Sequence, residues 1–167
     1  MLERLIQGNQ QYIQHSDSVP REKLAANGQH PHAVVIACSD SRVVPELIFD
    51  ATLGELFVIR VAGNVLDDQQ LGSIQYAVEH LGCRLVVMLG HTGCGAVAAA
   101  LAGHAEGYVL SIVNDIVQAI GAEKDPDRAA RANVLHGVER IRTAFPDSGI
   151  EVRGAMYDIR SGEVACL

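Results

Sequence analysis

The sequence predicts an α/β fold with a mainly parallel central β-sheet flanked by helices. Two unbroken apolar runs, residues 33–37 and 84–90, carry this prediction, because buried strands of a parallel sheet are apolar on both faces. A third run at 56–63 and the helical stripes between the runs give the strand-helix alternation of parallel βαβ units. We therefore expect a single domain over residues 1–167, without internal repeats or linkers.

Residues 1–30 are predicted to form a helical arm. Apolar side chains between Leu2 and Ile13 follow the i, i+3, i+4 spacing of an amphipathic helix, and a short second helix is expected around 22–26. A helix of this kind ahead of the first strand often packs on a neighbouring subunit.

Residues 31–105 are expected to form the core of the site. After the first strand, a short helix is predicted at 43–49 with Pro45 in its opening turn. Helix 72–81 follows the run at 56–63, and Gly82 is expected to cap it. Helix 95–101 begins directly after Cys94, where the positive end of its dipole favours a thiolate.

Residues 106–167 are expected to hold two helices and a final edge strand. The first helix covers about 109–120, and the last strand is placed at 150–159 on a sheet edge. The second helix is predicted from Asp127 as N-cap to Phe145, with one apolar face made of Val134, Leu135, Val138, Ile141 and Phe145.

Composition and charge exclude several classes of partner. The formal net charge is −7 and no basic block is present, which argues against nucleic acid or an anionic membrane as a partner. No apolar run approaches a membrane span, and the amino terminus lacks a signal pattern, so we expect a cytoplasmic protein. In that reducing compartment Cys83 is interpreted as a small buried hydrophobe and Cys166 as a tail thiol.

Metal-binding side chains follow two of the predicted strands. Cys38 comes directly after the run 33–37, and His91 and Cys94 follow the run 84–90. Because the carboxyl ends of parallel strands meet at one edge of a sheet, we expect the three side chains to converge there. Two thiolates and an imidazole are ligands that zinc (Zn2+) prefers, and three protein ligands leave a fourth position open for water, as in catalytic sites.

Asp40 and Arg42 follow Cys38 at alternate positions. We expect Asp40 to orient hydroxide on the zinc, and Arg42 to form a bidentate pair with the Asp40 carboxylate. A free Asp40 carboxylate is itself a good fourth zinc ligand and expels the water. The Asp40–Arg42 pair therefore decides whether the site is open, and Asp40 is both a catalytic candidate and an alternative metal ligand.

The two motifs, Cys38-Ser39-Asp40-Ser41-Arg42 and His91-Thr92-Gly93-Cys94-Gly95, resemble those of the β-class carbonic anhydrases. Segments 60–64 and 73–78 are also similar, so the likeness covers most of residues 29–101. The resemblance implies zinc on the two cysteines and the histidine, with the Asp-Arg pair as catalytic dyad. It also implies reversible hydration of CO2 to bicarbonate and a proton by zinc-bound hydroxide, in a homodimer or a higher even homo-oligomer.

The same resemblance implies four residues of a substrate cleft. Gln29 matches a glutamine that reaches into the partner subunit's site and hydrogen-bonds substrate. Phe57 and Tyr76 match aromatic residues that line the narrow cleft, and Ala62 stands at a small apolar wall position. An apolar cleft with one polar group suits CO2, whereas simple core packing is the alternative for Phe57 and Tyr76.

One departure and two alternative functions bear on the mechanism. Some members inhibit themselves by binding bicarbonate beside a tryptophan, but this chain has no tryptophan and carries Val35 at that position, which favours the open site. A carbonyl sulfide or carbon disulfide hydrolase needs the same zinc ligands. A non-catalytic zinc-binding dimer is the other alternative, although such a site has no use for Asp40 and Arg42.

Overall fold

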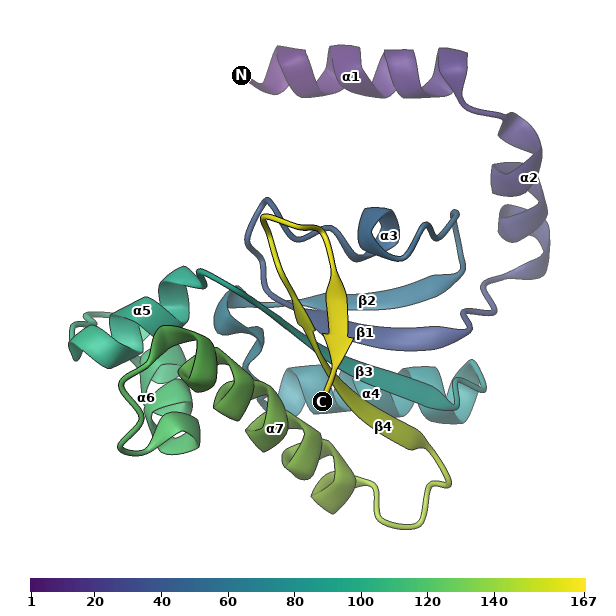
Figure 1. The fold of residues 1–167 in the computed structure, drawn as a ribbon. Helices are drawn as coiled ribbons and strands as arrows, with labels where there is room; N and C mark the ends of the chain where they lie inside the picture. Colours follow the sequence, from purple (N-terminus) through teal and green to yellow (C-terminus); the bar gives the residue numbers. More distant parts are fainter.

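The structure is a computed structural model that describes residues 1–167, and its centre is one five-stranded sheet in the order β2-β1-β3-β4-β5 (Figure 1). Strands β1 (Ala33–Ala37), β2 (Leu56–Arg60), β3 (Leu85–His91) and β4 (Glu151–Tyr157) run parallel. Strand β5 (Val164–Cys166) returns antiparallel to β4. The predicted α/β fold with a mainly parallel sheet is confirmed.

Strand β1 occupies the centre of the site because it has a parallel neighbour on each side. Its last residue, Ala37, lies opposite Arg60 of β2 and Leu89 of β3. All five residues of β1 are buried, which explains why its sequence is apolar without alternation. The register brings the carboxyl ends of β1 and β3 side by side.

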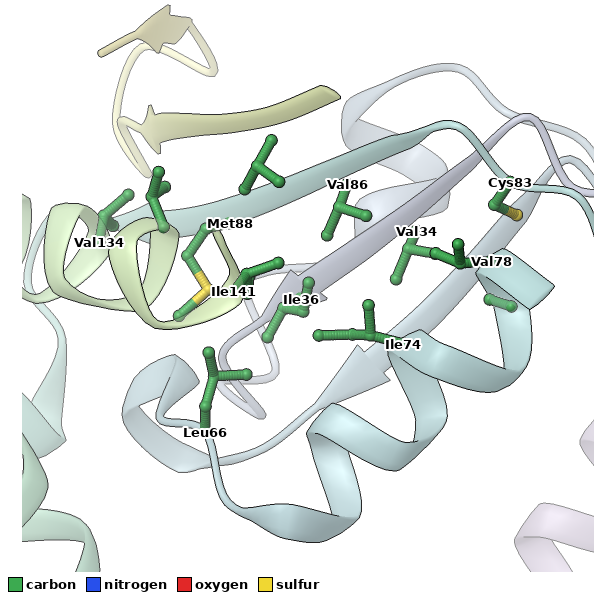
Figure 2. Packing of buried hydrophobic residues seen from close by; sticks show 13 residues of the cluster. Val34, Ile36, Leu66, Ile74, Val78, Cys83, Val86, Met88, Val134 and Ile141 are labelled. Carbon is green, nitrogen blue, oxygen red and sulfur yellow. The ribbon is translucent and has the colours of Figure 1, made fainter. Parts of the chain in front are cut away.

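Helices cover the sheet unequally. Helices α4 (Asp68–His80) and α7 (Pro126–Ala144) pack Ile74, Val78 and Ile141 against Ile36 and other apolar side chains of the sheet (Figure 2). The opposite face has a smaller buried cluster, against which α3 (Pro45–Ile48) packs through Ile48. Helices α5 (Gly95–Ala102) and α6 (Val109–Ile120) join α7 in a cluster that includes Cys38 and Cys94.

The first two helices, α1 (Leu2–His15) and α2 (Ser18–Asn27), form an arm that leaves the rest of the chain (Figure 1). Neither helix buries a single residue. The apolar side chains of α1 stay largely in solvent, with Leu5 at 72% and Ile6 at 54% exposure. An amphipathic helix gains little stability without a surface against its apolar face.

Strand β4 is not at the sheet edge where the sequence pattern placed it. It covers 151–157 and lies between β3 and β5, so the edge strand is β5. Its alternation of exposed Glu151 and Arg153 with buried Val152 is typical of a half-covered strand, and that pattern occurs inside a sheet as well as at its edge. The prediction missed β5 because it has only three residues.

The predicted start of α7 was also wrong. The N-cap is Asp125, whose carboxylate accepts the Arg128 backbone N–H at 2.9 Å, and Pro126 takes the first helical position. Asp127 lies inside the first turn, where an acidic side chain interacts favourably with the positive end of the helix dipole. Leu135 is 47% exposed and therefore does not belong to the buried face.

Candidate metal centre

The structure brings together Cys38, His91 and Cys94, the three side chains expected to converge at the carboxyl ends of the parallel strands. Cys38 directly follows β1, His91 is the last residue of β3, and Cys94 is the N-cap of α5. One ligand atom from each residue lies within 4.8 Å of the other two, and all three residues are buried. This spacing suits three ligands around a single metal ion.

The orientation of His91 leaves one ring nitrogen available. Its Nδ1 lies 2.9 Å from the carbonyl oxygen of Thr92, and because a carbonyl only accepts, Nδ1 carries the proton of the neutral ring. Nε2 then presents a lone pair, and it is buried without a partner. A buried polar atom without a partner is costly, and a metal ion at this position would satisfy it.

The two thiols shift each other's pKa. The pKa of Cys38 is lowered, chiefly by its interaction with the neighbouring Cys94 side chain. The same interaction raises the pKa of Cys94, and burial raises it further. The Val97 and Ala96 amides at the start of α5 lower the pKa of Cys94, as the helix dipole predicts, but their effect is outweighed.

These donors fit a zinc ion. Two soft sulfur ligands with a neutral imidazole form a ligand set that binds Zn2+ in preference to magnesium or calcium. Those two ions take oxygen ligands. Burial lowers the pKa of His91, but the neighbouring Cys38 sulfur and its charge outweigh burial and raise that pKa. A dication would remove this interaction and leave the imidazole neutral.

Asp40 is held by Arg42 and does not join the cluster of ligand atoms. Arg42 Nε donates to Asp40 Oδ1 at 3.0 Å and Nη2 donates to Oδ2 at 2.7 Å. The Arg42 backbone N–H also donates to Oδ1, at 2.9 Å. The pKa of Asp40 is well below its usual range, first because of the Arg42 side-chain bonds and then because of the backbone bond. The carboxylate is thus ionised and fixed in one pose.

Arg60, which the sequence reading did not assign a role, holds the backbone of the same loop. Its Nε donates to the Cys38 carbonyl at 3.1 Å, and its Nη2 donates to the Asp40 carbonyl at 2.7 Å. Arg60 is the last residue of β2 and lies beside the end of β1. Arg60 stands inside the apolar run 56–63 and its partners lie 22 and 20 residues away, so no local pattern in the sequence marks this role.

Three of the four expected cleft residues lie far from the Cys38, His91 and Cys94 cluster of the same chain. Gln29 and Tyr76 line one open pocket of about 690 Å³, and its apolar lining includes Leu24 and Ala25 of α2. The Phe57 and Tyr76 rings are 6.4 Å apart, and Phe57 lies opposite Val34 near the amino end of β1. Cys38 comes four positions after Val34, which is roughly 13 Å at the usual rise per residue of a strand. Only Ala62, which begins the turn 62–64, is close in sequence to a contact of Cys38.

The two aromatic residues differ in how far they are buried. Phe57 is half-buried and packs against the main core cluster, and its role in the cleft stays a prediction. Tyr76 is 48% exposed and stands between Phe57 and His80, whose ring centroid is 5.2 Å away. Core packing does not account for Tyr76.

Comparisons with known proteins agree on one family. The carbonic anhydrase family model matches residues 33–164. Carbonic anhydrase 2 of Mycobacterium tuberculosis H37Rv is 47% identical over 122 residues, which cover 70% of this chain and 59% of that protein. The chain thus spans about three fifths of the length of this curated relative.

Solved structures show the same fold over nearly the whole chain. The β-carbonic anhydrase CafA of the fungal pathogen Aspergillus fumigatus superposes with a TM-score of 0.81 at 28% identity, covering 99% of this chain and 90% of that one. A β-carbonic anhydrase of the ascomycete Sordaria macrospora, described as tetrameric, gives 0.77 at 29% identity, covering 99% and 93%. None of the helices in this chain has the length and apolar character needed to span a membrane.

Proposed function

Because this chain belongs to the β-class carbonic anhydrase family, we propose that it is a zinc enzyme that reversibly hydrates CO2 to bicarbonate and a proton. The observation that carries the proposal is the buried Cys38, His91 and Cys94 cluster beside an ionised Asp40. These are the residues that would hold the metal and the carboxylate that would act next to it.

Cys38, His91 and Cys94 would hold the zinc ion through two sulfur atoms and Nε2. When bound, zinc supplies a Lewis acid that generates hydroxide from water near neutral pH. The ionised Asp40 only accepts hydrogen bonds, so an O–H beside it must point its proton at the carboxylate and its lone pair elsewhere. Arg42 keeps both carboxylate oxygens engaged and so stops Asp40 from turning toward the metal ligands.

We further propose that the working unit is a homodimer, in which each chain completes its partner's cleft. Two observations support it. Gln29 and Tyr76 lie near the amino end of β1, whereas the metal ligands lie at the carboxyl ends of β1 and β3. Helix α1 also leaves its apolar side chains uncovered, and a second copy would bury them.

The deciding experiment compares three substrates on the same zinc-loaded protein. Stopped-flow hydration of CO2, with metal content measured in parallel, is expected to show one zinc per chain and rapid turnover. Carbonyl sulfide and carbon disulfide are then supplied to the same sample. Faster turnover of either sulfur compound would favour the hydrolase alternative. Fully zinc-loaded protein that turns over none of the three would favour a non-catalytic zinc dimer.

A further inference from the structure

A buried asparagine on α7 is hydrogen-bonded to the turn that contacts a metal ligand. Asn133 is 3% exposed, and its Nδ2 donates to the carbonyl oxygen of Gly63 at 2.8 Å. The two residues are 70 positions apart in the chain. Buried side-chain amides need such partners, so the bond fixes both the Asn133 side chain and the backbone that it meets.

Gly63 passes this restraint on to Cys38. Its own backbone N–H donates to Cys38 Sγ at 3.3 Å. Gly63 has a φ of +69°, a conformation that favours glycine, and a Cβ there would lie 2.8 Å from Ile116 Cδ1 and 2.9 Å from Ala96 Cβ. The turn is therefore enclosed by α5 and α6, and Asn133 ties it to α7.

We propose that Asn133 is a positioning residue for the metal centre, holding the 62–64 turn so that the Gly63 N–H stays on the Cys38 sulfur. The inference rests on the proposed zinc function. An N–H bond to a ligand sulfur fixes the rotamer of that side chain and draws electron density from the thiolate. Without Asn133, the Gly63 carbonyl loses its buried partner and the turn is free to shift away from Cys38.

The test uses the zinc-loaded protein and two matched variants. Asn133→Leu keeps the number and branching of the side-chain heavy atoms but removes the donor. Val138→Ala, on the same helix, removes buried methyl groups from the main core cluster. Both variants are expected to lower the melting temperature, so stability alone does not separate them.

Two readouts separate a positioning role from a merely structural one. Zinc affinity is measured by competition with a chelator, and exchange of the Gly63 amide hydrogen is followed by NMR. We expect Asn133→Leu to weaken zinc binding by about tenfold, as for other residues that support a metal ligand, and to speed Gly63 exchange. Val138→Ala is expected to leave zinc affinity within about twofold of wild type.

Each result has a definite meaning. Equal zinc affinity and equal Gly63 exchange in wild type and Asn133→Leu overturn the inference. If Asn133→Leu does not fold, Asn133→Ser, which is smaller, is subjected to the same two measurements and criteria. Wild-type protein that binds no zinc refutes the proposed function, whereas wild-type binding that the Asn133 variants match refutes only the role of Asn133.

Discussion

Arg42 engages both carboxylate oxygens of Asp40, with Nε 3.0 Å from Oδ1 and Nη2 2.7 Å from Oδ2. Arg42 Nη2 also donates to the Gly93 carbonyl at 3.3 Å, one residue before Cys94. The guanidinium fork of Arg42, with its bonds to Asp40 and Gly93, connects the loop after β1 with the loop after β3. The Arg42 side chain is 54% exposed, so the pair contributes little to folding stability, and its effect lies in where it points the carboxylate.

Arg42→Ala is therefore expected to keep zinc but lose turnover. Without the fork, Asp40 is free to turn toward the metal and block the fourth position. The loss in CO2 hydration should be on the order of 10²-fold, as for other positioned groups at a reacting centre. Stopped-flow rates per bound zinc measure it. If melting temperature falls while turnover per zinc is unchanged, Arg42 is only a scaffold residue.

Asp40→Asn isolates the acceptor role of the carboxylate. An asparagine is nearly isosteric but brings an NH2 donor, so it no longer forces a neighbouring O–H to point its proton at residue 40. We expect zinc content to equal that of wild type and turnover to fall by about 10²-fold or more. Turnover within a few fold of wild type, at full zinc content, would remove Asp40 from the mechanism.

Cys94→Ala tests the ligand assignment against a matched buried cysteine. Removing one of three ligands should abolish stoichiometric zinc binding and lower the melting temperature of the zinc-loaded protein. Cys83→Ala is the control. Cys83 is buried and forms no disulfide, and its thiol donates a hydrogen bond to the Pro31 carbonyl, away from the proposed ligands. The control is expected to retain one zinc per chain. Full zinc occupancy and activity in Cys94→Ala would show that another residue supplies the ligand.

The start of α7 supplies a pH-dependent stabilisation. The pKa of Glu123 is lowered from its ordinary 4.5, first by the Asp125 and Lys124 backbone amides and then by Arg128. Because the folded-state pKa is depressed, this stabilisation is fully present above the ordinary value and is lost as pH falls through the folded-state value. NMR titration of the Glu123 carboxyl should give a midpoint below 4.5. Arg128→Ala should keep most of the shift; a midpoint at 4.5 or above in wild type contradicts the assignment.

The convergence of Cys38, His91 and Cys94 was predictable from sequence because its signal is local. Cys38 and His91 each stand at the end of an apolar run, and parallel pairing of such runs places their ends together. The Asp40–Arg42 pair is local as well, since the two residues are two positions apart. One rule of sheet geometry was enough to predict the convergence of the strand ends, and the reach of one side chain was enough to predict the Asp40–Arg42 pair.

The supporting contacts had no such signal. Arg60 meets Asp40 across 20 residues, Gly63 meets Cys38 across 25, and Asn133 meets Gly63 across 70. Nothing near Asn133 distinguishes it from a polar residue on a solvated helix face, and only the packing of α7 buries it. The edge strand β5 was missed for a related reason, because its three residues form a strand only through pairing with β4.

A mixed dimer tests whether the chain completes its partner's site. One chain carries Gln29→Ala and keeps its metal centre, and the other carries Asp40→Asn and keeps Gln29. If Gln29 serves the partner subunit, the heterodimer has one complete site, formed by the metal centre of the first chain and Gln29 of the second. Random pairing makes half of the dimers mixed, so activity should recover to about a quarter of wild type.

The control is each variant chain alone, carried through the same dissociation and reassociation. Both homodimers lack a complete site, so their mixture before subunit exchange sets the baseline. If Gln29 acted within its own chain, the mixed dimer would contain one metal centre without Gln29 and one without Asp40. Activity would then stay at the baseline after exchange, and that outcome refutes the shared site. The position of Gln29, near the amino end of β1 and away from Cys38, favours recovery.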